Sequence, residues 1–307
     1  MGTTISGHNV VKRELKIILS RHMTLHKEVL KLMNQCTDFL YHYTSIETLA
    51  LILSNQTIRL NSLDQMDDLQ EKEASDIKNI GQFCYISSWT DDETESIPMW
   101  KMYSSLDSGV RIKLKTNPFK LFENTPESIK EVSVLPVTDE SNGVYLKSII
   151  PIADMMKKGY ICPAAMSDNI LHKVEYTSDP SKLYPRLVTY EGDKFSIFLG
   201  ALGIHKNIHW EFQHEWRYIL QFYPVNINQD PNILPTSVQI MANKILHGLE
   251  KQPFPFYDLQ LDDVAFSKME ITLSPKISAG YRLIVNSLIE KYNPSALIHN
   301  SSLLGLI

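Results

Sequence analysis

The sequence predicts an α+β fold, built from short strands and helices that alternate irregularly along the chain. Short apolar or alternating segments, typical of strands, lie at 39–43, 57–60, 82–89, 109–115 and 216–222. Apolar residues at helical spacing predict helices at 46–53, 97–103, 237–249 and 278–291. Because 43% of the 307 residues are hydrophobic, the chain can bury a large core.

Composition limits the classes of function. A net charge of −5 gives no overall basic field, so nonspecific nucleic-acid binding is not expected, although a local basic groove remains open. The three cysteines, Cys36, Cys84 and Cys162, are far apart, which favours a reducing compartment and argues against a structural metal site. The chain shows neither a membrane-length apolar run nor a signal peptide, so we expect a cytoplasmic protein without a membrane partner.

The chain divides into an N-terminal helical extension, residues 1–37, and a main domain, residues 38–307. Apolar residues recur at three- and four-residue steps between 8 and 35, with basic residues mostly elsewhere. The pattern predicts one long amphipathic helix or two shorter ones, which either dock a partner or nucleic acid, or pack on the main domain with a solvated basic face.

The main domain opens with a strand that carries His42 towards the start of a helix. Thr44 or Ser45 supplies the helix cap, and the strand that follows the helix carries Arg59. A histidine beside helix N-terminal amides suits a site for a sugar and a phosphate. The alternative is a structural histidine that hydrogen-bonds a neighbouring turn.

Two segments of the middle region contain candidate functional groups. The acidic stretch 64–73 lacks the glycine and final glutamate of an EF-hand, so we expect a solvated loop. In the helix 97–103, Trp100 and Tyr103 are neighbours on the surface and suit the stacking of a planar ring. Aromatic residues at this spacing also occur in protein cores.

The second half of the domain is less regular. We expect strands at 132–137 and 174–177, a helix between 190 and 207, and a terminal strand at 296–299. A further strand is predicted at either 263–266 or 269–273. At the start of the strand 216–222, Glu215 and Arg217 point to the same side, where they either orient a substrate hydroxyl or form a structural salt bridge.

Motifs of other chemistries are weak or missing. The sequence contains no GxGxxG, Walker, HExxH or GxSxG motif. His205, His209 and His214 lie close together in sequence but lack carboxylate or cysteine partners in a recognised pattern, so we expect no metal.

Three motifs together resemble a bacterial family whose domain has no assigned function. They are LYHYTS at 40–45, MWKMY at 99–103 and EWR at 215–217, and the similarity extends through the tail at 271–276 and 298–301. One departure is plain: where the family has Asn-Asp-Pro and a glutamate, this chain has Met66-Asp67-Asp68 with Glu71 three residues later.

The opening of that family also resembles ADP-ribosyltransferases, especially the DarT toxins that modify DNA. The resemblance implies a split mixed β core with surrounding helices, and NAD as a substrate without a metal. It implies catalytic roles for His42, Tyr103 and Glu215, which occur here in the order typical of these transferases. The implied NAD-binding residues are His42, Tyr43, Thr44, Ser45, Arg59, Trp100, Tyr103 and Arg217.

The resemblance implies an intracellular bacterial toxin or phage-defence effector that transfers ADP-ribose to DNA or RNA, with a protein acceptor still open. A toxin of this kind implies an antitoxin partner. The alternative is a catalytically silent module that binds a nucleotide or a protein. A metal-dependent nuclease that uses the acidic stretch 64–73 ranks last.

Overall fold

The computed structural model describes residues 37–124, 146–166, 170–192, 194–225 and 234–307. The predicted helix in 8–35 and the predicted strand at 132–137 lie outside the described residues. Of the predicted extension 1–37, only the last residue is described.

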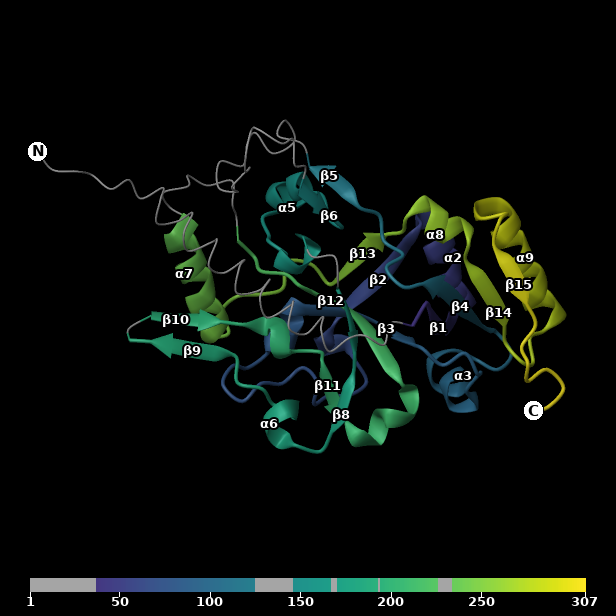
Figure 1. The fold of residues 1–307 in the computed structure, drawn as a ribbon, viewed down its shortest axis with the longest axis horizontal. Coiled ribbons are helices and arrows are strands. Elements are labelled where there is room, and N and C mark those ends of the chain that lie inside the picture. Colours follow the sequence, from purple (N-terminus) through teal and green to yellow (C-terminus); the bar gives the residue numbers. More distant parts are fainter. Residues whose placement is uncertain (1–36, 125–145, 167–169, 193, 226–233) are drawn as a thin grey trace, which may run out of the picture.

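A mostly antiparallel sheet organises the described part of the chain (Figure 1). Only β14 and β15 pair in parallel within it, so the mixed α and β structure expected from the sequence is confirmed. Its strands are β1 (Phe39–Ser45), β2 (Thr57–Ser62), β3 (Cys84–Thr90), β4 (Gly109–Lys115), β7 (Leu171–Lys173), β12 (Glu215–Gln221), β13 (Phe256–Gln260), β14 (Glu270–Leu273) and β15 (Leu297–His299).

Helices and small two-stranded ladders surround the sheet, with α2 packed against α9 at one end (Figure 1). The helices are α2 (Ile46–Asn55), α3 (Ile97–Tyr103), α5 (Ile152–Lys158), α6 (Pro180–Leu183), α7 (Leu234–Leu246), α8 (Asp263–Ser267) and α9 (Ala279–Tyr292). The ladders join β5 (Phe122–Asn124) to β6 (Leu146–Ser148), β8 (Glu175–Thr177) to β11 (His205–Asn207), and β9 (Val188–Glu191) to β10 (Lys194–Ile197).

The sheet forks at β3. Strand β12 pairs with β3 along its whole length and occupies one edge. Strands β1 and β2 therefore share the other edge, where β2 lies opposite Tyr85 and Ile86 and β1 lies opposite Thr90. Between these contacts β1 and β2 diverge, and α2 connects them. The fork lies beside Ser87 and Ser88 of β3.

The alternation of side chains along β3 separates two apolar cores. Tyr85 and Trp89 point into the larger core, which also contains the buried side of α2. Cys84 and Ile86 point to the opposite face, into a smaller core that includes Ile219 of β12. The smaller core covers the face of β12 from which Glu215 and Arg217 also project.

Local patterns located several elements well, one expectation was wrong, and one pair of alternatives is resolved. The structure has the predicted helix at 97–103 and the predicted strand at 109–115. The helix expected between 190 and 207 is instead the β9–β10 hairpin followed by β11, because Gly192, with φ +61°, forms the turn between the paired residues Glu191 and Lys194. Residues 263–267 form α8, which Asp262 caps, and the strand lies at 270–273.

Ser45 caps α2, and this predicts a measurable effect on stability. Its Oγ accepts a hydrogen bond from the Thr48 backbone N–H at 3.1 Å. Replacing Ser45 by Ala removes this acceptor and should lower the free energy of unfolding by about 1 kcal/mol in chemical denaturation. Ser45→Asp should retain most of the stability, and Ser54→Ala on the exposed end of α2 is the matched control. Equal stability of Ser45→Ala and wild type would contradict the capping role.

Candidate functional site

Glu215 and Arg217 lie side by side at the edge of the smaller core. In the ladder between β3 and β12, Glu215 is opposite Thr90 and Arg217 is opposite Ser88. Alternate residues of one strand project to the same face. The structure thus places the carboxylate and the guanidinium together, as their two-residue spacing predicts.

The Arg217 guanidinium is fully buried and binds two carboxylates. Its Nε donates to Glu215 Oε1 at 2.7 Å and its Nη2 to Glu215 Oε2 at 3.0 Å, the two-pronged geometry in which guanidinium and carboxylate match best. Nη2 also lies 2.8 Å from Oε2 of Glu71. Nη1 donates to the carbonyl of Gly203 at 3.0 Å. Carboxylates and a carbonyl therefore replace the water that this cation would bind if exposed.

Lys206 of β11 is the second cation at this place. Its Nζ lies 3.0 Å from Glu215 Oε2, 3.1 Å from Glu71 Oε1 and 2.9 Å from Gln213 Oε1. We call Glu71, Lys206, Gln213, Glu215 and Arg217 the ionic cluster. Two carboxylates and two cations balance each other, which is the condition under which charges can be buried together.

The ionic cluster fixes the charge of Glu215. Burial alone would raise the pKa of this carboxyl, but the charges of Arg217 and Lys206 outweigh burial, and hydrogen bonds from Arg217 and Ser88 add to their effect. The pKa falls to about 2, so Glu215 is ionised throughout the physiological range. Burial would lower the pKa of Arg217, and the carboxylates of Glu215 and Glu71 raise it instead.

Two tyrosines join the ionic cluster. Gln213 Nε2 donates to the Tyr103 oxygen at the end of α3, and the backbone N–H of Glu215 donates to the Tyr176 oxygen at 2.8 Å. Burial raises the pKa of Tyr103, and the nearby carboxylate of Glu215 adds to the shift. Tyr103 is therefore protonated, and since its oxygen already accepts a hydrogen bond, its own O–H is available to donate.

His42 lies on β1 beside the fork, where β1 diverges from β2 along β3. Its Nδ1 lies 2.8 Å from the Ser88 carbonyl oxygen. A carbonyl only accepts, so Nδ1 carries the proton, and burial lowers the pKa of the ring so that it is neutral. Nε2 is then an acceptor, and no hydrogen-bond partner for it is found in the described part of the chain.

The pleat of β1 separates His42 from Glu215. Tyr41 is opposite Thr90, and both side chains project from the face that carries Glu215. The next residue, His42, therefore projects from the opposite face, where the centre of its ring lies 5.0 Å from the centre of the Trp89 ring. Ser88 connects the two sides, because its carbonyl binds His42 and its hydroxyl binds Glu215.

The remaining predicted site residues do not join the ionic cluster. They are buried or hydrogen-bonded to other parts of the chain. Trp100 is fully buried, lies edge-on against Tyr43, and donates its Nε1 hydrogen to Glu95 at 3.0 Å. The Tyr43 oxygen accepts a hydrogen bond from Ser96. Thr44 is buried and its carbonyl accepts from Ser104, while Ser45 caps α2.

Arg59 lies on another part of the sheet. It binds both carboxylate oxygens of Asp258 on β13, at 2.8 and 2.9 Å, and stacks over the Phe256 ring at 3.4 Å. This pairing holds Arg59 at the β2–β13 edge, whereas the ionic cluster lies on β12.

Sequence reasoning missed Glu71, Lys206 and Gln213 as partners of Glu215. Glu71 belongs to the acidic stretch that was expected to be a solvated loop, yet it is buried. One signal was present in the resemblance, whose motif has a glutamate near this position, although this chain departs from that motif at Met66-Asp67-Asp68. Gln213, two residues before Glu215, projects into the same cluster and links it to Tyr103.

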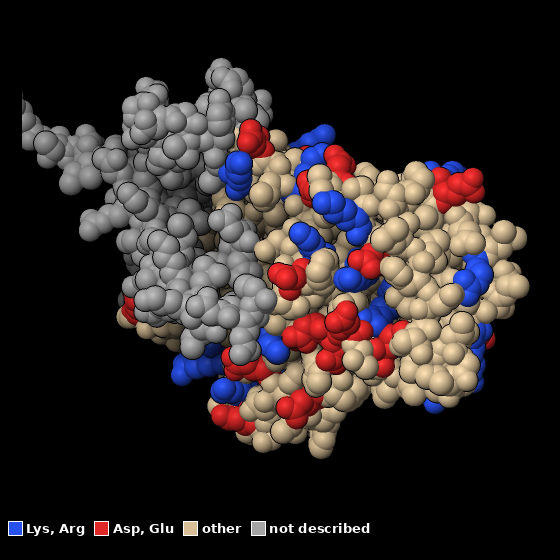
Figure 2. Space-filling view, turned by 45° about the vertical axis from the view of Figure 1, so that its right-hand side comes forward, with Lys and Arg blue, Asp and Glu red and all other residues tan. Residues whose placement is uncertain are grey.

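The surface near Glu215 is partly apolar. The short 3₁₀ helix Ile208–Gln213 connects β11 to β12 and exposes Ile208 and Phe212. On the face drawn in Figure 2, acidic and basic side chains are intermixed and acidic ones gather near the middle. A cavity of about 480 Å³ lies elsewhere, between β13 and α5, and none of the ionic cluster lines it.

The described residues contain neither a metal-binding cluster nor a helix that could span a membrane. In the described ranges, no group of three or more His, Cys, Asp and Glu side chains is placed to hold a metal ion. His205 instead lies near Glu175 and His214 near Asp92. Among the helices described, none is long and apolar enough to cross a bilayer.

Compared with models of protein families, with curated proteins and with solved structures, the chain has no match. The transferase resemblance therefore rests on the sequence motifs alone.

Removing the Arg217 charge should strongly destabilise the fold. Arg217→Met leaves two buried carboxylates with Lys206 as their one remaining cation among the described residues, and should cost about 3–5 kcal/mol of unfolding free energy in chemical denaturation. Arg186→Met is the control, because that side chain is 71% exposed, and should change stability by less than about 0.5 kcal/mol. Similar losses in both variants would show that the ionic cluster is not a key electrostatic support.

The low pKa of Glu215 predicts how stability depends on pH. The folded-state pKa of about 2 lies below the ordinary 4.5, so the contribution of Glu215 is complete above about pH 5 and is lost as pH falls towards 2. Glu215→Gln cannot be protonated at this position, so its unfolding free energy should fall less steeply over the same interval. Parallel pH profiles for the variant and wild type would contradict the shift.

Proposed function

We propose that this protein is an NAD-dependent ADP-ribosyltransferase with Glu215 at its catalytic centre. The observation that carries the proposal is a carboxylate, ionised at neutral pH, that is held by Arg217 and Lys206, with the Tyr103 hydroxyl joined to it through Gln213. The order of His42, Tyr103 and Glu215 along the chain agrees with the motifs of the transferases that the sequence resembles.

The chemistry of this transfer suits a fixed negative charge. Breaking the bond between ribose and nicotinamide develops positive charge on the sugar, and a preorganised carboxylate stabilises that charge without rearranging. A carboxylate with a pKa near 2 is a poor proton acceptor at neutral pH. The role of Glu215 is therefore electrostatic stabilisation and binding of a ribose hydroxyl, rather than deprotonation of the acceptor.

The remaining groups receive roles from their hydrogen-bonding capacity. Nε2 of His42 accepts a hydrogen bond from a ribose hydroxyl, because Nδ1 already donates to Ser88. Tyr103 stacks on or donates to the nicotinamide, and Arg217 orients Glu215. We leave Arg59 and Trp100 out of this site, since the first binds Asp258 and the second is fully buried.

Nucleic acid is the acceptor that the resemblance favours, and the protein then acts as an intracellular toxin or phage-defence effector neutralised by an antitoxin. The net charge of −5 and the intermixed charges in Figure 2 give no broad basic surface on that face. The acceptor would thus be held through a small local contact.

A second candidate is a catalytically silent module that binds a nucleotide or a protein. The observation that favours it is the internal pairing of Glu215, which already accepts hydrogen bonds from Arg217 and Lys206. The pleat that separates His42 from Glu215 supports the same alternative. Such a module binds NAD without consuming it.

Transfer of label from NAD tests the proposal. NAD tagged on adenine is incubated with the protein and, separately, with DNA, RNA or cell protein. We expect label on one acceptor, and a loss of at least about a hundredfold in Glu215→Gln, because the developing charge loses its counter-ion. Glu211→Gln, an exposed residue of the 3₁₀ helix that precedes β12, should keep full activity.

Nicotinamide release measured in the same reactions separates the two candidates. Binding of NAD without release or transfer, equal in wild type and Glu215→Gln, would establish the silent module. Transfer that survives Glu215→Gln would show that the reaction is catalysed at another site.

A further inference from the structure

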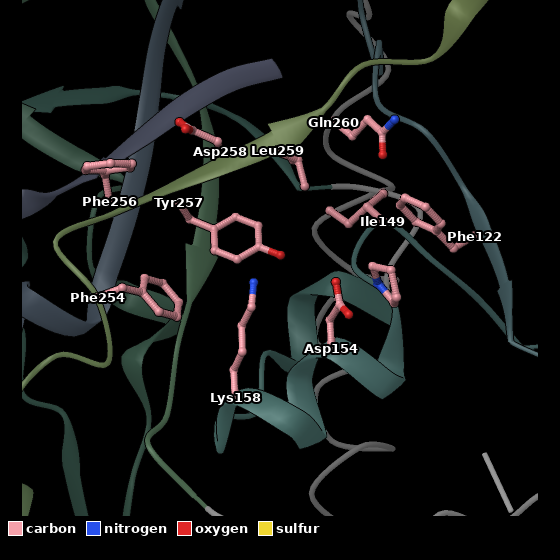
Figure 3. Close-up of a pocket in the computed structure, with 11 residues that line it drawn as sticks. Phe122, Ile149, Asp154, Lys158, Phe254, Phe256, Tyr257, Asp258, Leu259 and Gln260 are labelled. Atoms are coloured by element: carbon pink, nitrogen blue, oxygen red, sulfur yellow. The ribbon is translucent and has the colours of Figure 1, made fainter. Parts of the chain in front are cut away.

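The cavity between β13 and α5 has the features of a second small-molecule site. Its volume of about 480 Å³ falls within the range of ligand pockets in proteins. We call it the α5 pocket and describe it by the six side chains that matter to its chemistry: Phe122, Asp154, Lys158, Phe254, Tyr257 and Gln260. Figure 3 shows the Tyr257 ring and the Lys158 amine pointing towards one another inside it.

Aromatic rings provide apolar walls for a planar ligand. The Phe254 and Tyr257 rings lie 5.3 Å apart, and both pack against Phe222 in a larger aromatic group. Phe122 lines the pocket from β5 at the other end (Figure 3). Rings fixed by their neighbours bind a planar ligand at little cost in side-chain entropy.

Two hydrogen-bond donors face the pocket beside these rings. The Tyr160 hydroxyl donates to the Tyr257 oxygen at 3.4 Å, which leaves the Tyr257 proton free to donate. Burial raises the pKa of Tyr257 to about 12, so this proton is present at neutral pH. Lys158 Nζ lies 6.0 Å from the Tyr257 ring centre, and no ion pair of Lys158 is found in the described ranges. An ammonium and a hydroxyl together favour an anion such as phosphate.

A carboxylate and an amide lie at the end of the pocket formed by Phe122. The Asp154 carboxylate, one helical turn before Lys158 on α5, and the Gln260 amide both border the pocket (Figure 3). Among the described residues neither side chain has a hydrogen-bond partner. A glutamine amide can pair with the amino group and ring nitrogen of adenine. An ionised carboxylate accepts only, and so selects an amino group over a carbonyl oxygen.

We propose that the α5 pocket binds an adenine nucleotide. The base lies against Phe122 with its amino group at Asp154 and Gln260, and the phosphate binds Lys158 and Tyr257 at the other end, beside Phe254. None of the ionic cluster lines this pocket, so the inference is independent of the proposed transfer reaction. Arg59 supports the pocket wall, since its partner Asp258 is part of the lining.

Calorimetric titration of the full-length protein with AMP tests this assignment, with adenosine, IMP and inorganic phosphate as comparison ligands. We expect AMP to bind and Lys158→Met to weaken it at least about tenfold, as expected for a lost phosphate contact. Lys157→Met, the neighbouring exposed residue on α5 that does not line the pocket, should bind AMP as wild type does. Asp154→Asn should reduce the preference for AMP over IMP.

Two further results decide the location. Glu215→Gln should retain AMP binding even if it abolishes transfer, so the two proposals can fail separately. No AMP binding by folded protein, or binding equal in wild type and Lys158→Met, would overturn the assignment. AMP binding lost in Glu215→Gln would assign the nucleotide to the ionic cluster instead.

Discussion

A guanidinium held away from water must be surrounded by acceptors, and this requirement of Arg217 organises one whole face of the sheet. It brings Glu71 in from a loop, fixes Glu215 on its own strand and turns the Gly203 carbonyl inward. Lys206 completes the charge balance from β11. The loop, two strands and the 3₁₀ helix between them are thus held together by ionic contacts where the smaller apolar core ends.

Such a cluster supports two uses. As a structural element it holds the loop around Glu71 against the sheet. As a reaction centre it provides a carboxylate whose charge and position are set before any ligand arrives, which is the form of electrostatic assistance that enzymes use most. The links from Glu215 to Tyr103 and to Ser88 favour the second use, because they extend the cluster to the Tyr103 O–H and, through Ser88, to Nε2 of His42, which retain unused hydrogen-bonding capacity.

Local sequence patterns located elements better than they located contacts. The pairing of Glu215 with Arg217 followed from the strand repeat, because the two are neighbours in sequence. Glu71 lies 146 residues from Arg217, and Asp258 lies 199 residues from Arg59, so no short pattern indicates either partner. Helical spacing likewise showed that Trp100 and Tyr103 are neighbours. It gave no means of telling that Trp100 enters the core while Tyr103 meets Gln213.

The forked sheet constrains the order in which the chain acquires its structure. Strand β3 is synthesised early, but the strand that covers one of its edges, β12, follows more than a hundred residues later, as does β13 for β2. Contacts this distant in sequence form slowly, because a long loop must close first. While the ribosome is still making the second half, Glu71 has neither of its cations, and the edge of β3 stays unpaired with β12. A nascent chain therefore has no assembled ionic cluster. Any activity of Glu215 begins only after most of the chain has emerged from the ribosome.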